Sequence, residues 1–360
     1  MRFFDYLRLK DRSWDSEILS YVAQIHEFKG KQELFLRQKP VELNRLIEIA
    51  RIQSTESSNR IEGIVTTNPR LQQLMADKTT PRNRDEEEIL GYRNVLSLVH
   101  ENYSLIPLTP NYILQLHGEL LKHTNLTYGG KFKNVPNEID MITAEGKRVT
   151  LFRPLQPYET PAAVRSICDS FRLAREKEAV DALILIPSFI LDFLCIHPFN
   201  DGNGRMSRLL TLLLLCQSGY FVGQYVSIEK SIADTKDAYY RALEEADEGW
   251  HEGRNDPDPF IKYMLAVILS CYRDFERRVT IAEQAGARST AYDIVRACVR
   301  QKIGLFTKKE ILMECPSIGS SSVEAALKRL VSEGCIRRIG AGRGTSYARV
   351  PLASSEAPKG

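Results

Sequence analysis

Several features that define common protein classes are missing from this sequence. Its seven cysteines include no CxxC pair and its six histidines no HExxH spacing, which argues against a disulfide framework and against a zinc site. The longest apolar run, residues 182–196, is shorter than the roughly 20 residues of a membrane-spanning helix and is interrupted by Pro187 and Asp192. Residues 1–13 have no apolar stretch of the kind found in secretion signals. We therefore expect a cytoplasmic protein that has no membrane contact and contains small, buried, reduced cysteines.

The net charge of +3 is low, but it is unevenly distributed along the chain. Residues 288–349 contain twelve Lys or Arg and five Asp or Glu, a net charge of +7 that leaves −4 for the remainder. A basic segment on a mildly acidic body predicts a polyanionic partner, and DNA is the first candidate. A solvated basic face without a partner is the alternative interpretation.

Most of the chain has the apolar spacing of α-helices, so we expect a mainly α fold. Helices are predicted over 43–61 with Gly63 as the stop, 86–103, 110–122, 160–175, 181–196, from about 205 to 219, 233–247 and 259–283. Thr109 is expected to cap the helix that begins at Pro110. Two short β-rich runs flank residues 144–147 and predict a hairpin, which on a helical body is usually a surface flap.

The C-terminal segment, residues 288–350, has a different pattern. It predicts a helix over 292–302, a second helix from Thr307 and an amphipathic helix over 320–333 with Val323, Leu327 and Leu330 facing inward. A strand, a glycine-rich turn and another strand follow. Helix, turn, helix and hairpin is the order of a winged-helix domain. Residues 351–360 are expected to form a flexible tail.

The most informative stretch lies between two strongly apolar helices, from His197 to Arg208. Gly202 and Gly204 tolerate positive φ angles, and such a turn before a helix directs several N–H groups at one anion. Arg205 and Arg208 follow, three residues apart. Two cations near a helix N-terminus oppose the helix dipole, but a bound polyphosphate explains them because guanidinium groups match phosphate oxygens.

Two further side chains give this loop the elements of a reaction centre. Asp201 is a hard carboxylate beside the expected anion site, where Mg²⁺ typically binds one or two carboxylates together with phosphate oxygens. His197 precedes the loop and is suited to act as a general base toward a hydroxyl group, because its ordinary pKa is near neutrality. The combination predicts a transfer reaction on a polyphosphate substrate.

This stretch resembles the signature of the Fic family, HxFx(D/E)GNGRxxR, at every fixed position, and the resemblance extends from about Trp14 to about Glu276. It implies a Fic-type helical bundle that transfers AMP from ATP to a Ser, Thr or Tyr hydroxyl of a protein. It also implies roles for the loop residues: His197 as base, Asp201 as Mg²⁺ ligand, Phe199 as apolar anchor, and Asn200, Gly202, Asn203, Gly204, Arg205 and Arg208 as phosphate-binding residues. Related Doc kinases have lysine at the position of Gly204, so phosphate transfer is not expected.

A second motif, from Ser58 to Gly63, resembles the inhibitory pattern (S/T)xxxE(G/N) of Fic proteins that restrain themselves. The resemblance implies that Glu62, at the end of a helix, pairs with Arg208 and removes a ligand of the γ-phosphate. Taken alone, a glutamate just before the glycine that ends a helix is more often an ordinary solvated residue.

Two weaker likenesses complete the expected site. Tyr239 and Tyr240 resemble the nucleotide-side tyrosines of the family, although the sequence does not decide which of them stacks near adenine. Ile142 and Thr143 of the flap are expected to hold the target chain by strand addition.

The expected domains are an N-terminal helical region (1–100) containing an inhibitory helix at about 43–63, a catalytic domain (101–284), the winged-helix domain (288–350) and the tail. Two other functions compete with AMP transfer. The basic winged helix alone would make the chain a DNA-binding regulator, and the same Fic site would also suit removal of AMP from a modified protein. The sequence leaves open the target protein, the choice of nucleotide beyond ATP, and whether the chain forms a homo-oligomer.

Overall fold

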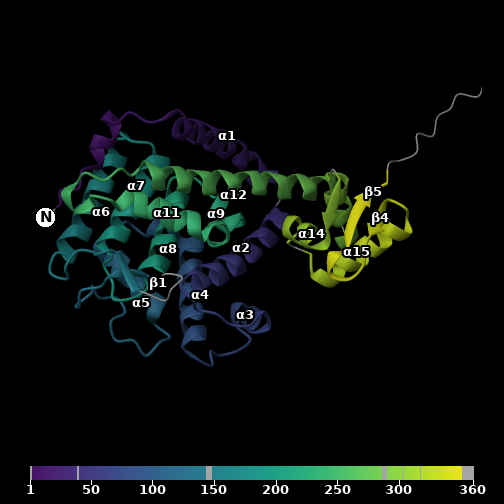
Figure 1. The fold of residues 1–360 in the computed structure, drawn as a ribbon, viewed down its shortest axis with the longest axis horizontal. Helices are drawn as coiled ribbons and strands as arrows, with labels where there is room; N and C mark the ends of the chain where they lie inside the picture. The colour runs from purple at the N-terminus through teal and green to yellow at the C-terminus, as the bar shows by residue number, and fades with distance from the viewer. Residues whose placement is uncertain are drawn as a thin grey trace, which may run out of the picture. The chain divides into compact units, whose positions relative to one another are not determined.

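The computed structural model describes residues 2–38, 40–142, 148–285, 290–302, 304–316 and 318–350 (Figure 1). The chain divides into two compact units. One comprises Met1–Leu34 and Ala50–Cys271, and the other comprises Phe35–Ile49 and Tyr272–Gly360.

The first 285 residues are predominantly helical, which confirms the predicted fold class. The α-helices are α1 (Ser16–Gln38), α2 (Pro40–Ile61), α3 (Asn68–Met75), α4 (Arg84–Asn102), α5 (Pro110–Leu121), α6 (Thr160–Glu176), α7 (Ala182–Ile196), α8 (Asn203–Gln217), α9 (Val222–Tyr225), α10 (Ile228–Asp234), α11 (Lys236–Asp247) and α12 (Asp258–Ala285). Short 3₁₀ helices lie at η1 (Tyr6–Asp11), η2 (Tyr103–Leu105) and η3 (Trp250–Glu252).

Local sequence explains where several of these helices begin. The Thr109 side chain accepts a hydrogen bond from the N–H of Tyr112, with Pro110 at the first helical position of α5, as predicted. Asn83 caps α4 in the same way, and Asp181 caps α7. A capping side chain satisfies an N–H that has no partner within the helix, so these polar residues fix the helix starts.

The core of the first unit is built around α7 and α8, whose inner residues are almost all buried. Phe171 of α6 packs edge-on against Phe189 of α7, with ring centroids 5.3 Å apart. Within the described residues, no helix combines the length and apolar character that crossing a membrane requires. Six of the seven cysteines are buried free thiols, but Cys335 is exposed and was wrongly expected to be buried.

The predicted hairpin is present as β1 (Ile139–Ile142) and β2 (Arg148–Phe152), paired antiparallel with Ile142 opposite Arg148. The turn that joins them, residues 143–147, lies outside the described residues, and with it Thr143. The expected single helix over 233–247 is wrong, because the structure has α10 and α11 with a break at Thr235.

The second unit has its own apolar core. Its elements after α12 are α13 (Ala291–Arg300), β3 (Leu305–Thr307), α14 (Lys308–Glu314), α15 (Ser320–Ser332), β4 (Ile336–Ile339), η4 (Gly342–Gly344) and β5 (Ser346–Arg349), with strand order β3-β5-β4. Val323, Leu327 and Leu330 are buried as predicted. The strand β3 was not expected, because Thr307 was taken only as a helix start. Assignment of this unit as a winged-helix domain stays a prediction, as do the domain boundaries.

Candidate functional site

The loop between α7 and α8 reverses the chain through two residues with positive φ. His197 ends α7 with φ 50° and ψ 64°, a left-handed conformation that is uncommon for a residue with a side chain. Gly202 has φ 82° and precedes the first residue of α8, Asn203. The helix therefore begins two residues earlier than expected, so that Arg205 lies in its first turn and Arg208 lies one turn later.

Side chains inside the loop fix its shape. The amide of Asn203 accepts a hydrogen bond from the Phe199 N–H at 2.9 Å and donates one to the Phe199 carbonyl at 2.8 Å. Asn137 donates to the same carbonyl at 3.0 Å. The Lys133 ammonium donates to the Ile196 carbonyl at 3.0 Å. Because the side chain of Asn203 is committed to the loop, only its backbone N–H is left for the expected phosphate contact.

Phe199 is fully buried, in agreement with its expected role as an anchor. Its ring stacks on that of His117 with centroids 3.7 Å apart. His117 accepts a hydrogen bond from the Gly130 N–H at Nδ1 and donates from Nε2 to the Asp201 carbonyl at 3.0 Å. Burial lowers the pKa of His117 to about 4, so this histidine is neutral and holds the loop in place through its hydrogen bonds and its stacking on Phe199. Sequence reasoning missed it because its partners lie far along the chain.

The half-buried imidazole of His197 has one nitrogen in use. Its Nδ1 donates to the Leu194 carbonyl at 3.3 Å, which places the proton on Nδ1 and leaves the lone pair on Nε2. Burial, followed by the nearby Lys133 charge, lowers the pKa of His197 to about 4. The ring is therefore neutral at physiological pH and able to accept a proton, as a general base must.

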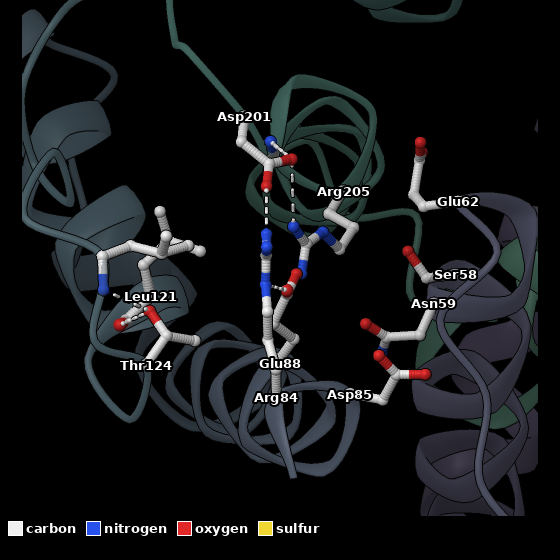
Figure 2. A network of polar contacts seen from close by, with 12 residues as sticks. Ser58, Asn59, Glu62, Arg84, Asp85, Glu88, Leu121, Thr124, Asp201 and Arg205 are labelled. Atoms are coloured by element: carbon white, nitrogen blue, oxygen red, sulfur yellow. Dashed lines mark hydrogen bonds and ion pairs between the residues drawn. The ribbon is translucent and has the colours of Figure 1, made fainter.

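Arg208, Ser58 and Glu62 are brought together as the inhibitory motif implies. Arg208 donates from Nη2 to Glu62 Oε1 at 2.7 Å and from Nε to the Ser58 hydroxyl at 2.8 Å. It also donates to the Ser58 carbonyl at 3.0 Å. The guanidinium is 3% exposed and the Glu62 side chain 33%. Ser58 and Glu62 belong to α2 and the turn after it (Figure 2).

The Glu62 carboxylate also lies directly over the start of α8. A methyl carbon placed on Gly204 would be 2.2 Å from Glu62 Oε1. The first N–H groups of a helix have no partner within it and favour a negative charge. An anion therefore already lies where the sequence predicted phosphate binding, and it comes from the protein itself.

The two loop arginines reach different partners. Arg205 is 1% exposed, and its Nη1 lies 2.6 Å from Glu88 Oε2 on α4 while Nη2 lies 3.4 Å from Asp201 Oδ1. The Arg205 guanidinium thus pairs with Glu88, whereas that of Arg208 pairs with Glu62. A phosphate-binding role for Arg205 stays a prediction.

Asp201 is partly exposed and its two oxygens differ. Oδ1 accepts the Gly202 N–H at 2.6 Å, and Oδ2 pairs with Arg84 Nη2 at 3.3 Å. No group of three His, Cys, Asp or Glu that could hold a metal is found among the described residues. Asp201 thus offers one carboxylate, which fits the way Mg²⁺ binds beside substrate phosphates. Arg84 and Glu88 were also missed, since only the fold brings α4 to this loop.

The remaining expected residues are placed as follows. Tyr239 is buried against Phe260, whereas Tyr240 is 38% exposed. Burial of part of the ring and then the Glu62 charge raise the pKa of Tyr240. Stacking of either tyrosine on a nucleotide stays a prediction. The side-chain amide of Asn200 donates a hydrogen bond to the side-chain oxygen of Asn134 at 3.0 Å and accepts one from the Asn134 backbone N–H.

Residues 107–215 match the model of the Fic/DOC family. This chain carries a Fic/DOC family domain. The Fic domain contains α5 to α7, the loop and most of α8, so the match includes every loop residue described above.

Curated relatives support the same family. A probable protein adenylyltransferase of Aquifex aeolicus is 31% identical over 137 residues, 38% of this chain and 36% of that protein. A protein adenylyltransferase Fic of Nematostella vectensis is 24% identical over 229 residues, 62% of this chain and 48% of that protein. The chain thus spans about a third to a half of the length of these relatives.

A solved structure supports the fold. A Fic family protein of Desulfovibrio desulfuricans superposes with a TM-score of 0.60 at 20% identity, covering 95% of this chain and 98% of that one. At this identity the likeness concerns the fold alone.

Proposed function

We propose that this chain is a protein adenylyltransferase that transfers AMP from ATP to a Ser, Thr or Tyr hydroxyl of a target protein. One observation carries the proposal: the imidazole of His197, whose Nε2 has no recorded hydrogen-bond partner among the described residues, lies at the start of the loop that leads into the N-terminus of α8. The hydroxyl oxygen bonds to the α-phosphorus, its proton passes to Nε2, and pyrophosphate leaves. The names of the curated relatives support the same activity.

Asp201 is the residue that would hold Mg²⁺. A divalent cation bound there would neutralise phosphate charge and orient the triphosphate. The N–H groups of the first turn of α8 would bind phosphate oxygens, and Arg208 would bind the γ-phosphate once it is free of Glu62. Tyr240 would stack on adenine, while Ile142 and Thr143 would hold the target by strand addition.

Glu62 acts as a brake in this proposal. Its carboxylate accepts a hydrogen bond from Arg208 Nη2 and lies over Gly204. In this proposal the outer phosphates of ATP would bind at these same two positions. ATP would then bind with misplaced phosphates, and a small misplacement costs on the order of 10²-fold in rate. Ser58 supports the brake, since it fixes the Arg208 guanidinium.

The test is incubation of the full chain with labelled ATP, Mg²⁺ and cell lysate, followed by mass spectrometry of the labelled proteins. Wild type, Glu62→Gly and His197→Ala are compared. AMP on protein hydroxyls that depends on His197 would support the proposal, and label on no protein with any variant would refute it. The reverse reaction is tested by giving the labelled proteins back to wild type and measuring AMP release.

The second unit supports an additional candidate function, duplex DNA binding. A groove of about 610 Å³ is lined in part by Lys308, Lys309, Lys328 and Arg338. Lys309, Lys328, Arg337 and Arg338 are exposed, and the side chain of Arg343, which the sequence adds to this set, is not described. We expect full-chain binding to duplex DNA to weaken steeply with salt, and to weaken further in Lys328→Ala/Arg338→Ala. Absence of binding at low salt would favour target recognition by this unit.

The domain organisation, with an inhibitory helix at about 43–63, a catalytic domain at 101–284 and a winged helix at 288–350, is part of the proposal. A cytoplasmic location agrees with seven free cysteines, which are typical of a reducing compartment. The sequence leaves open whether the chain forms a homo-oligomer, which light scattering would measure.

A further inference from the structure

Four charged side chains form a closed ring beside the loop (Figure 2). Arg84 Nε donates to Glu88 Oε1 at 2.7 Å, and Glu88 Oε2 lies 2.6 Å from Arg205 Nη1. Arg205 Nη2 lies 3.4 Å from Asp201 Oδ1, and Asp201 Oδ2 lies 3.3 Å from Arg84 Nη2. Positive and negative groups alternate, so each charge has a partner on both sides.

The two halves of the ring differ in burial. Glu88 and Arg205 are 3% and 1% exposed, while Arg84 and Asp201 are 59% and 37% exposed. Breaking a buried ion pair leaves an uncompensated charge and is strongly unfavourable. An exposed pair is worth little because water replaces it. The contact between Arg84 and Asp201 is therefore the place where the ring opens.

Asp201 makes that contact through its Oδ2. Its Oδ1 is engaged by the Gly202 N–H and by Arg205. Among the described residues, the partner recorded for Oδ2 is Arg84. A hard divalent cation is commonly bound by a carboxylate oxygen of this kind, and a guanidinium bound to it is a direct electrostatic competitor.

We propose that the Arg84 guanidinium occupies Asp201 Oδ2 and is displaced when a divalent cation binds there. A divalent cation and the Arg84 guanidinium compete for Oδ2, and cation binding moves Arg84 away while Glu88 keeps Arg205 in position. Arg84 thus sets the concentration of divalent cation that the site requires, although Arg84 is not itself a metal ligand. This inference rests on the proposed assignment of the metal to Asp201.

The test is titration of the nucleotide-free full chain with Mn²⁺, with free Mn²⁺ measured by electron paramagnetic resonance. Arg84→Ala is expected to bind Mn²⁺ about 1.4- to fivefold more tightly than wild type, the range given by the loss of one exposed ion pair. Arg84→Lys keeps the charge but loses the planar fork, so its affinity should lie between the two. Thermal unfolding checks that each variant is folded.

Arg82→Ala is the matched control. Arg82 is exposed, lies two residues before Arg84 and makes no ion pair with Asp201. The Arg82→Ala substitution therefore removes one positive charge from the same segment without opening the ring, and should change the Mn²⁺ affinity less than Arg84→Ala does. Asp201→Asn should abolish the binding that Arg84→Ala strengthens.

Equal effects of Arg82→Ala and Arg84→Ala would overturn the proposal, because the general field would then explain the gain. Weaker binding in Arg84→Ala, or no binding by any variant, would overturn it as well. Transfer from labelled ATP is measured in parallel. If AMP is transferred but Arg84→Ala has the wild-type Mn²⁺ affinity, the role of Arg84 is refuted and the proposed function stands. If Arg84→Ala binds Mn²⁺ more tightly but no variant transfers AMP, the proposed function is refuted and the role of Arg84 stands.

Discussion

Replacement of Glu62 by glycine is the most direct test of the brake. The change removes the carboxylate from Arg208 Nη2 and from the space over Gly204. Residue 62 follows the last residue of α2, Ile61, so glycine there does not interrupt the helix. We expect transfer to rise because the phosphates gain the guanidinium and the helix N-terminus together.

The contact itself sets the expected size of the effect. Arg208 is nearly buried, and its 2.7 Å bond to Glu62 is charge-assisted. A hydrogen bond to a charged group contributes about 1.5–3 kcal/mol, and about 1.4 kcal/mol corresponds to a factor of ten. Glu62→Gly should therefore raise transfer about ten- to a hundredfold.

The assay is self-modification and target modification with labelled ATP and Mg²⁺, read by autoradiography and intact mass. Glu62→Gln keeps the shape but not the charge and should give an intermediate gain. Glu56→Gly, on the exposed side of the same helix, is the matched control and should leave transfer unchanged. Arg208→Ala in the Glu62→Gly background should cancel the gain.

A Glu62→Gly variant no more active than wild type on any substrate would refute the reasoning. Glu62 would then be an ordinary residue at a helix end. Equal activation by Glu56→Gly would also refute it, because loosening of α2 would explain the gain without the Arg208 contact.

Three further outcomes are expected. His197→Ala should lower transfer by roughly 10²–10⁴ while ATP binding persists; wild-type transfer rates would exclude His197 as the base. The pKa of His197 is lowered to about 4, so the base becomes protonated only below about that pH. Transfer at saturating Mg²⁺ should therefore stay level from pH 7.5 to about pH 5.5; a midpoint near 6.5 would contradict a ring whose pKa is lowered by its half-buried position. Asn203→Ala should lower the free energy of unfolding by about 1–3 kcal/mol, because it leaves the Phe199 N–H and carbonyl without their partner; unchanged thermal unfolding would argue against that role.

Much of the fold could be predicted because its signals are local. The apolar spacing of α7 and α8, and the pairing of Thr109 with Pro110, depend on residues within a few positions of each other. The break between α10 and α11 was missed because the helical pattern continues across Thr235. Strand β3 of the second unit was missed for a related reason: three residues are too few for a readable alternation.

The sequence by itself determined which charged, polar and glycine residues lie together in the loop from His197 to Arg208 and in the motif from Ser58 to Gly63, since each stretch is contiguous in the chain. Only the tertiary structure decided what each side chain touches. Arg205 turned out to be buried against Glu88, and Asp201 to be paired with Arg84, 117 positions away. Such pairs depend on how α4 packs beside the loop, and because packing is set by the whole core, no local pattern encodes it.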